Sequence, residues 1–72
     1  MNKRLLEAVM REHGDTGTVL SEYLGIARST FSAKINETNG AEFTQSEIAK
    51  IKERYTLTAE KVDNIFFGKK VS

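Results

Sequence analysis

The sequence predicts an all-α domain, a compact bundle of five helices, and three observations support this prediction. The chain of 72 residues contains no proline, and its few glycines stand where helices are expected to end or the chain to turn. Apolar residues recur at the i, i+3 and i+4 spacing of a helix face in successive segments of the chain. A chain of this length forms one domain with a small core, which favours helices joined by short connections.

The first helix is expected to cover about residues 2–13. Asn2 can cap its amino end through a side-chain oxygen, and Gly14 ends it. The apolar positions lie on one face: Leu5, Leu6, Val9 and Met10. His13 falls in the last turn, where an imidazolium is favoured by the helix dipole, and a lone His in a chain without cysteine makes a poor metal site.

Two short helices joined by a tight turn are predicted between residues 16 and 36. Thr16 is the expected cap of the first, with Thr18 as an alternative. In this helix Leu20 and Leu24 lie four residues apart on an inner face shared with a partly buried Tyr23. Gly25 suits the left-handed conformation in which a chain leaves a helix abruptly. Ile26 then fills the turn as an apolar plug.

The second helix of this pair is predicted over residues 28–36, with Phe31 and Ile35 as its two inward anchors. Ala27 stands where a capping Ser, Thr, Asp or Asn is expected, which costs about 1 kcal/mol relative to those residues. The remaining positions of the helix are small, polar or basic. Arg28 and Lys34 are its charged residues, and no acid lies between residues 27 and 36. This pattern predicts a locally positive outer surface suited to nucleic acid.

The rest of the chain reads as a loop and two further helices. Residues 36–43 contain Asn39-Gly40, a strong turn signal that also leaves a small hairpin open. Thr44 and Glu47 have the spacing of a capping box for a fourth helix whose polar face is solvated, and Thr58 can cap a fifth helix that ends at Gly68. Residues 69–72 are expected to form a frayed tail.

Composition excludes several classes of function. The formal net charge is +1, and there is no cysteine for a disulfide framework or a thiolate metal site. No apolar run reaches the roughly 20 residues needed to cross a bilayer, and acidic and basic residues interrupt the first apolar stretch, as they would not in a signal peptide. No catalytic constellation is present, so we expect no enzyme, no cofactor, no metal and no small-molecule substrate. These features fit the cytoplasm.

The order of these pieces resembles the lambda-repressor-like (Cro/repressor, XRE-type) helix-turn-helix family, and most of all its small single-domain phage and prophage regulators. The resemblance covers about residues 3–67 and is most specific over residues 24–36, LGIARSTFSAKIN. It implies a five-helix bundle in a bacterial host cell. In such a bundle the second helix spans the DNA backbone, and the third enters the major groove.

The resemblance also implies a set of DNA-contacting positions. Residues facing base edges would be Ala27, Arg28, Ser29, Ser32, Ala33 and Asn36, and residues near phosphates would be Thr16, Gly17, Thr30 and Lys34. Three of these positions depart from the family pattern: Gly17 replaces a Gln, Ala27 a Ser, and Ala33 a long polar or basic residue. These losses predict modest affinity, or specificity read partly from DNA shape.

Several of these side chains have two open interpretations. Arg28 can pair with guanine, or it can contact only phosphate or solvent. Asn36 can read adenine or cap the end of its own helix. Lys34 is expected to contact phosphate. Phe67 and Val71 are the apolar residues expected to make a self-contact in a homodimer, unless Phe67 folds into the monomer core.

Two functions follow from these patterns. The first is a sequence-specific transcriptional regulator that binds double-stranded DNA, with dimers on two half-sites about one helical turn apart. The second is a protein-interaction adaptor of the antirepressor or antitoxin type, with weak or no DNA binding. Gly17, Ala27 and Ala33 motivate this alternative because they remove expected contacts.

Overall fold

The computed structural model describes residues 1–68 and contains, within that range, five α-helices, one short 3-10 turn and no strand. In chain order these are α1 (Lys3–Glu12), α2 (Gly17–Leu24), α3 (Arg28–Asn36), the turn η1 (Thr38–Gly40), α4 (Gln45–Tyr55) and α5 (Ala59–Phe66). The all-α prediction is thus confirmed. The hairpin left open for residues 36–43 does not form, because η1 occupies that segment.

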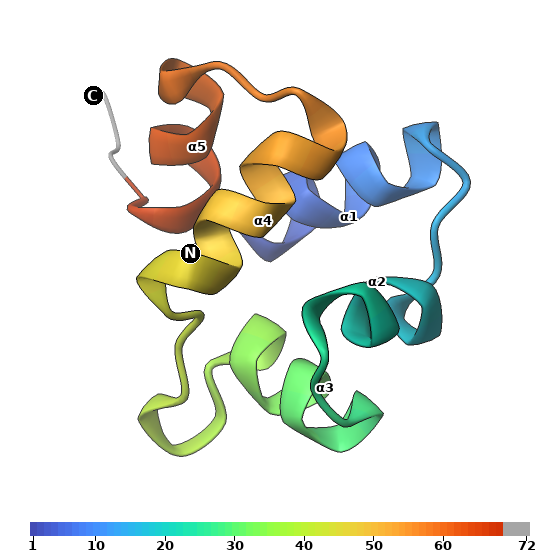
Figure 1. The fold of residues 1–72 in the computed structure, drawn as a ribbon. Helices are drawn as coiled ribbons and strands as arrows, with labels where there is room; N and C mark the ends of the chain where they lie inside the picture. The colour runs from blue at the N-terminus through green and yellow to red at the C-terminus, as the bar shows by residue number, and fades with distance from the viewer. Residues whose placement is uncertain (69–72) are drawn as a thin grey trace.

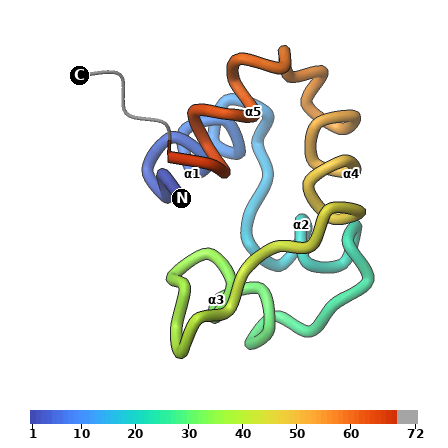
Figure 2. Tube along the Cα trace, turned by 90° about the vertical axis from the view of Figure 1, so that its left-hand side faces the viewer, coloured from blue at the N-terminus to red at the C-terminus, as the bar shows by residue number. Residues whose placement is uncertain are grey.

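The helices are distributed between two ends of the molecule, as two perpendicular views show (Figures 1 and 2). Helix α3 and the loop after it lie at one end, next to α2. Helices α1, α4 and α5 gather toward the other end. This placement leaves one side of α3 without a covering element.

The predicted caps form at the helix ends. Asn2 accepts a hydrogen bond from the Leu5 amide, and Thr16, Thr44 and Thr58 each accept one from the amide three residues further on. Such a bond satisfies one of the backbone donors that a helix start leaves free. The start of α3 lacks one, since Ala27 makes no side-chain cap bond. All five assignments agree with the sequence prediction.

A single apolar core joins all five helices. Its buried members are Leu6, Val9, Met10, Leu20, Leu24, Phe31, Ile35, Phe43, Ile48, Ile51, Tyr55, Val62 and Ile65. Phe43, in the loop before α4, packs edge-on against Phe31 at 5.8 Å and against Phe66 at 5.9 Å between ring centroids. This loop residue therefore links α3 to α5 through aromatic contacts, which favour such edge-on geometry.

A polar cluster ties the loop between α1 and α2 to the end of α4. The Arg54 guanidinium donates to both carboxylate oxygens of Asp15, at 2.8 and 3.1 Å, and the Tyr55 hydroxyl donates to Asp15 at 2.6 Å. These bonds hold the pKa of Asp15 below its ordinary value. Arg54 also lies 4.7 Å from the centroid of the Tyr23 ring. The prediction that the polar face of the fourth helix is solvated is therefore wrong for Arg54, because its partner comes from a distant segment.

The end of α5 leaves a large apolar side chain at the surface. Phe67 is 49% exposed, so it does not fold into the core, and Gly68 follows it with a φ of 57°. The predicted self-contact of Phe67 stays a prediction. Its suggested companion Val71 and the predicted tail of residues 69–72 lie outside the described residues.

Candidate nucleic-acid interface

Helix α3 is held to the core by two side chains and is otherwise turned outward. Phe31 is 2% and Ile35 7% exposed, which confirms both as core anchors. The exposed residues at the start and end of the helix are Ala27, Arg28, Ser29, Thr30 and Asn36, while Ser32, Ala33 and Lys34 are half-buried. We call the surface formed by residues 27–30, 32, 33 and 36 the outer surface of α3.

The turn between α2 and α3 sets how α3 leaves the core. Gly25 has a φ of 76°, in the left-handed region that glycine adopts without strain. The Gly25 amide donates to Glu22 at 3.1 Å, and the Ile26 amide donates to Ser21 at 3.0 Å. Ile26 packs partly buried against the core. Because these bonds satisfy the last carbonyls of α2, the chain can turn into α3 within three residues.

The amino end of α2 lies beside the amino end of α3. Thr16 is exposed, and its hydroxyl oxygen is used in capping α2. Gly17 is half-buried, and the three heavy atoms nearest to where its Cβ would stand all belong to the guanidinium of Arg28, at 2.9 to 3.0 Å. Arg28 is thus folded across the first turn of α2.

Arg28 keeps a free charge in this position. Its guanidinium carbon lies 5.8 Å from the centroid of the Phe31 ring. Within residues 1–68 the guanidinium makes no hydrogen bond and no ion pair. Its donors remain available to a ligand on the outer surface of α3.

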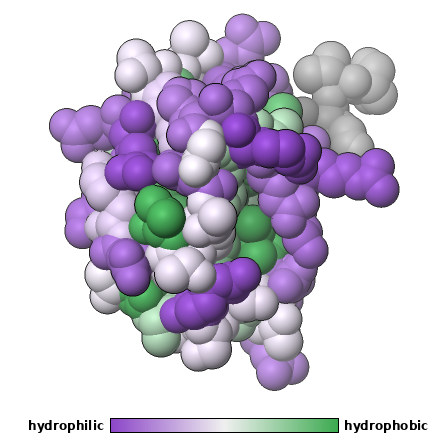
Figure 3. All heavy atoms as spheres, turned by 90° about the vertical axis from the view of Figure 1, so that its right-hand side faces the viewer, coloured by the Kyte–Doolittle hydropathy of each residue, from purple (hydrophilic) through white to green (hydrophobic). Residues whose placement is uncertain are grey.

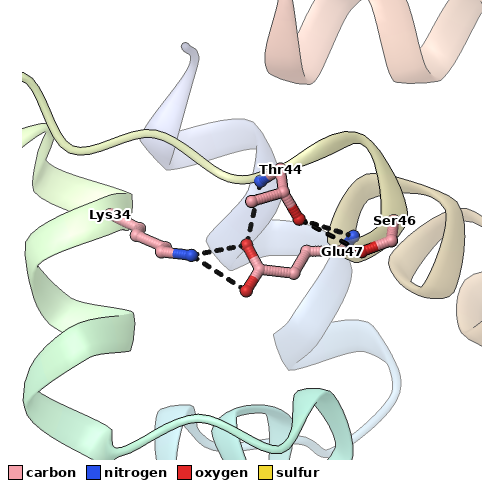
Figure 4. Close-up of polar contacts among 4 residues, drawn as sticks. All are labelled: Lys34, Thr44, Ser46 and Glu47. Atoms are coloured by element: carbon pink, nitrogen blue, oxygen red, sulfur yellow. Dashed lines mark hydrogen bonds and ion pairs between the residues drawn. The ribbon is translucent and has the colours of Figure 1, made fainter.

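Lys34 is paired within the protein. Its ammonium donates to both carboxylate oxygens of Glu47, at 2.7 and 2.9 Å, across the gap between α3 and α4 (Figure 4). The side chains of Lys34 and Glu47 are only 15% and 10% exposed. The expected phosphate contact of Lys34 stays a prediction, which this ion pair on the inner side of the helix does not favour.

Glu47 serves two structural purposes at once. It accepts from the Thr44 amide at 2.9 Å to complete the predicted capping box, and it binds Lys34 through the same oxygen (Figure 4). Burial raises the pKa of Glu47, but the bonds from Lys34 and from the Thr44 amide outweigh burial and leave the pKa below its ordinary value. Glu47 is therefore ionised at neutral pH and fixes α3 to the start of α4.

Asn36 is engaged within the protein. Its amide group donates to the Ser32 carbonyl at 3.0 Å, and its oxygen accepts from the Lys3 ammonium at 2.6 Å. These bonds resemble the predicted use of Asn36 as a cap of its own helix. Hydrogen bonding to an adenine base would need the same two groups of Asn36. Lys3 brings a cation from α1 to the carboxyl end of α3.

No ridge of free carboxylates covers the outer surface of α3 among the described residues. Glu37, directly after the helix, binds the amino group of Met1 at 2.9 Å, and Glu47 is paired on the inner side. Glu7 lines a pocket of about 180 Å³ with Arg28 and Lys3, without an ion pair to either within residues 1–68. The cations beside α3 are therefore Arg28 at its start and Lys3 at its end.

Sequence reasoning missed Lys3 and Glu47 as neighbours of α3. The capping box predicted the local bonds of Glu47, but no local signal indicates that its carboxylate also reaches a lysine on another helix. Lys3 lies 33 positions from Asn36 in the chain. Such pairs follow from how helices pack, which spacing within one helix does not reveal.

The comparisons add no relative to these observations. No protein family, curated protein or solved structure matches the chain. Within the described residues no cluster of His, Asp and Glu side chains is arranged to hold a metal ion. No described helix has the length and apolar character that crossing a membrane requires.

Proposed function

We propose that this chain is a sequence-specific regulator of transcription that binds double-stranded DNA, with a lambda-repressor-like helix-turn-helix formed by α2 and α3. In this proposal α3 enters the major groove and α2 lies across the backbone. The observation that carries the proposal is the outer surface of α3. It is uncovered at one end of the molecule, it holds hydroxyls and a free guanidinium, and none of its residues is acidic.

The size of the molecule supports binding as a pair. One module of this kind buries about 600–1,000 Å² on DNA, which favours a second copy for useful affinity. The principal extents of the fold are 34 × 28 × 20 Å, and successive half-sites on one side of DNA are about 34–36 Å apart. Two copies placed one helical turn apart would come into contact where their longest extent lies along the DNA, with Phe67 as the proposed apolar residue of that contact.

A protein-interaction adaptor is the second candidate, and the Lys34–Glu47 pair favours it. The pair removes one of the two cations of α3 from the ligand. An argument against the adaptor is that, on the one face shown in Figure 3, hydrophobic residues form separate patches among hydrophilic ones. A tight protein interface contains a more apolar buried centre.

Fluorescence anisotropy with labelled genomic fragments tests the proposal at two salt concentrations. We expect saturable binding that weakens as salt rises, because each phosphate contact releases counterions. A competing random duplex should displace the protein less well than the preferred fragment does. Absence of salt-dependent binding to every fragment would contradict the regulator and leave the adaptor.

A further inference from the structure

Gly17 has no evident backbone reason to be glycine. It is the first residue of α2 and has no positive φ, so an L-residue fits its backbone. Glycine in a helix costs up to about 1 kcal/mol relative to alanine. The reason for glycine must therefore come from its surroundings.

Those surroundings are the guanidinium of Arg28. A Cβ on residue 17 would stand 2.9 Å from the guanidinium carbon and from Nη2, and 3.0 Å from Nε. These distances are shorter than normal contacts of a carbon atom, so a Cβ at position 17 would displace the guanidinium, which is the mobile end of a flexible side chain. A hydrogen at position 17 leaves the guanidinium its place across the first turn of α2.

Arg28 also has an aromatic neighbour. Phe31 lies one turn further along α3, with its ring centroid 5.8 Å from the guanidinium carbon, a distance at which a ring face attracts a cation. A free arginine side chain loses up to about 2 kcal/mol of conformational entropy when a ligand fixes it. Phe31 borders Arg28 before any ligand arrives, and Gly17 leaves the guanidinium room across the first turn of α2.

We propose that Gly17 is a positioning residue, whose missing side chain leaves open the place across α2 from which Arg28 meets DNA. The part of this inference that concerns DNA binding rests on the proposed function. The contact between residues 17 and 28 exists in the free protein. Gly17 thus contributes to the interface through Arg28, at a position where a side chain of its own would interfere.

A double-mutant cycle of Gly17→Ala and Arg28→Ala tests the proposal by DNA affinity. Residues in contact commonly couple, so we expect Gly17→Ala to weaken binding about three- to tenfold in the parent protein and by less than about twofold in the Arg28→Ala background. The thermal midpoint of Gly17→Ala should not fall, since alanine is the better helix former. Lys52→Ala, which removes an exposed charge from the second half of α4, is the control and should bind like the parent.

A spectroscopic measurement separates this inference from the proposed function. In the free protein, nuclear Overhauser effects should join the Gly17 Hα protons to the side chain of Arg28. Gly17→Ala should shift the Arg28 Nε–H resonance more than Lys52→Ala does. Missing effects, or equal losses of affinity from Gly17→Ala in both backgrounds, would overturn the positioning of Arg28. If the parent binds no duplex while these effects are seen, the DNA-binding proposal fails, and with it the DNA half of the inference.

Discussion

The two basic residues of α3 lie in contrasting surroundings. Arg28, at the amino end, is exposed and unpaired within the described part of the chain, and it lies over a glycine. Lys34, six residues further on, is 15% exposed and bonded to both oxygens of Glu47. In the sequence both residues are equivalent positive charges, but in the structure only one of them remains available to a ligand.

The difference has a physical origin. Lys34 lies on the side of α3 that faces α4, where loss of water makes an unpaired ammonium costly and a carboxylate partner necessary. Arg28 lies at the start of the helix, where water solvates its donors and packing restricts its rotation. One cation therefore stabilises the fold, and the other is proposed to bind DNA.

The largest effect is expected from a substitution that disturbs both the packing of α3 and the surroundings of Arg28. Phe31 anchors α3 and lies beside Arg28. Phe31→Ala should lower the free energy of unfolding by about 3–5 kcal/mol, because it leaves a cavity in a small core. Urea denaturation followed by circular dichroism measures this loss. Val19→Ala, at a side chain 40% exposed, is the control and should change stability by less than about 0.5 kcal/mol.

Lys34→Met tests whether Lys34, unlike Arg28, stabilises the fold. It keeps most of the aliphatic stem but leaves the Glu47 carboxylate without its ammonium, so we expect a loss of about 1–3 kcal/mol in the free energy of unfolding. The salt dependence of DNA binding should stay that of the parent, since the lysine charge is already neutralised.

Glu47→Gln provides the matched partner for that experiment. The amide oxygen of glutamine can still accept from the Thr44 amide, so the capping box is kept. Combined with Lys34→Met, it should restore part of the lost stability, because no unpaired charge remains. A Lys34→Met variant as stable as the parent, with weaker and less salt-dependent DNA binding, would reverse the roles assigned to the two cations.

Arg28→Ala should give the opposite result. We expect a loss of about tenfold in DNA affinity, equivalent to about 1.4 kcal/mol, and a change in stability within about 0.5 kcal/mol. Anisotropy titrations on a preferred and a random duplex measure the loss. A larger loss on the preferred duplex assigns a base contact, while equal losses with a salt slope reduced by about one unit assign a phosphate contact. An affinity equal to that of the parent would remove Arg28 from the interface.

Mild acid should give the smallest effect, and it should act on the paired carboxylates. The pKa values of Asp15 and Glu47 both lie below their ordinary values of 3.8 and 4.5. The unfolded chain therefore binds more protons in acid, and the stability that both groups contribute above those values is lost as pH falls through their lowered pKa values. Urea midpoints should decrease slightly between about pH 6 and pH 4, and further below that. Asp15→Asn with Glu47→Gln should flatten the dependence, and a midpoint that rises in acid would contradict the two pKa directions.

Local patterns predicted most of the fold. Each cap depends on one side chain and an amide three residues away, and each inner face depends on the repeat of the helix, so both can be read within a short window. The same holds for Gly25, whose left-handed conformation lies outside the range most side chains prefer. The sequence of residues 36–43 does not by itself decide the conformation of this loop, because Asn39-Gly40 suits a hairpin and a 3-10 turn equally well.

The amino-acid sequence by itself determined the helix limits, the anchors Phe31 and Ile35, and the absence of acids from α3, since these depend on neighbours along the chain. Only the tertiary structure decided which distant charged and polar side chains are paired. The partners Asp15–Arg54, Lys34–Glu47 and Lys3–Asn36 are separated by 39, 13 and 33 positions. The same packing decided that Arg28 lies over Gly17, because a clash between two helix starts exists only once the helices have met.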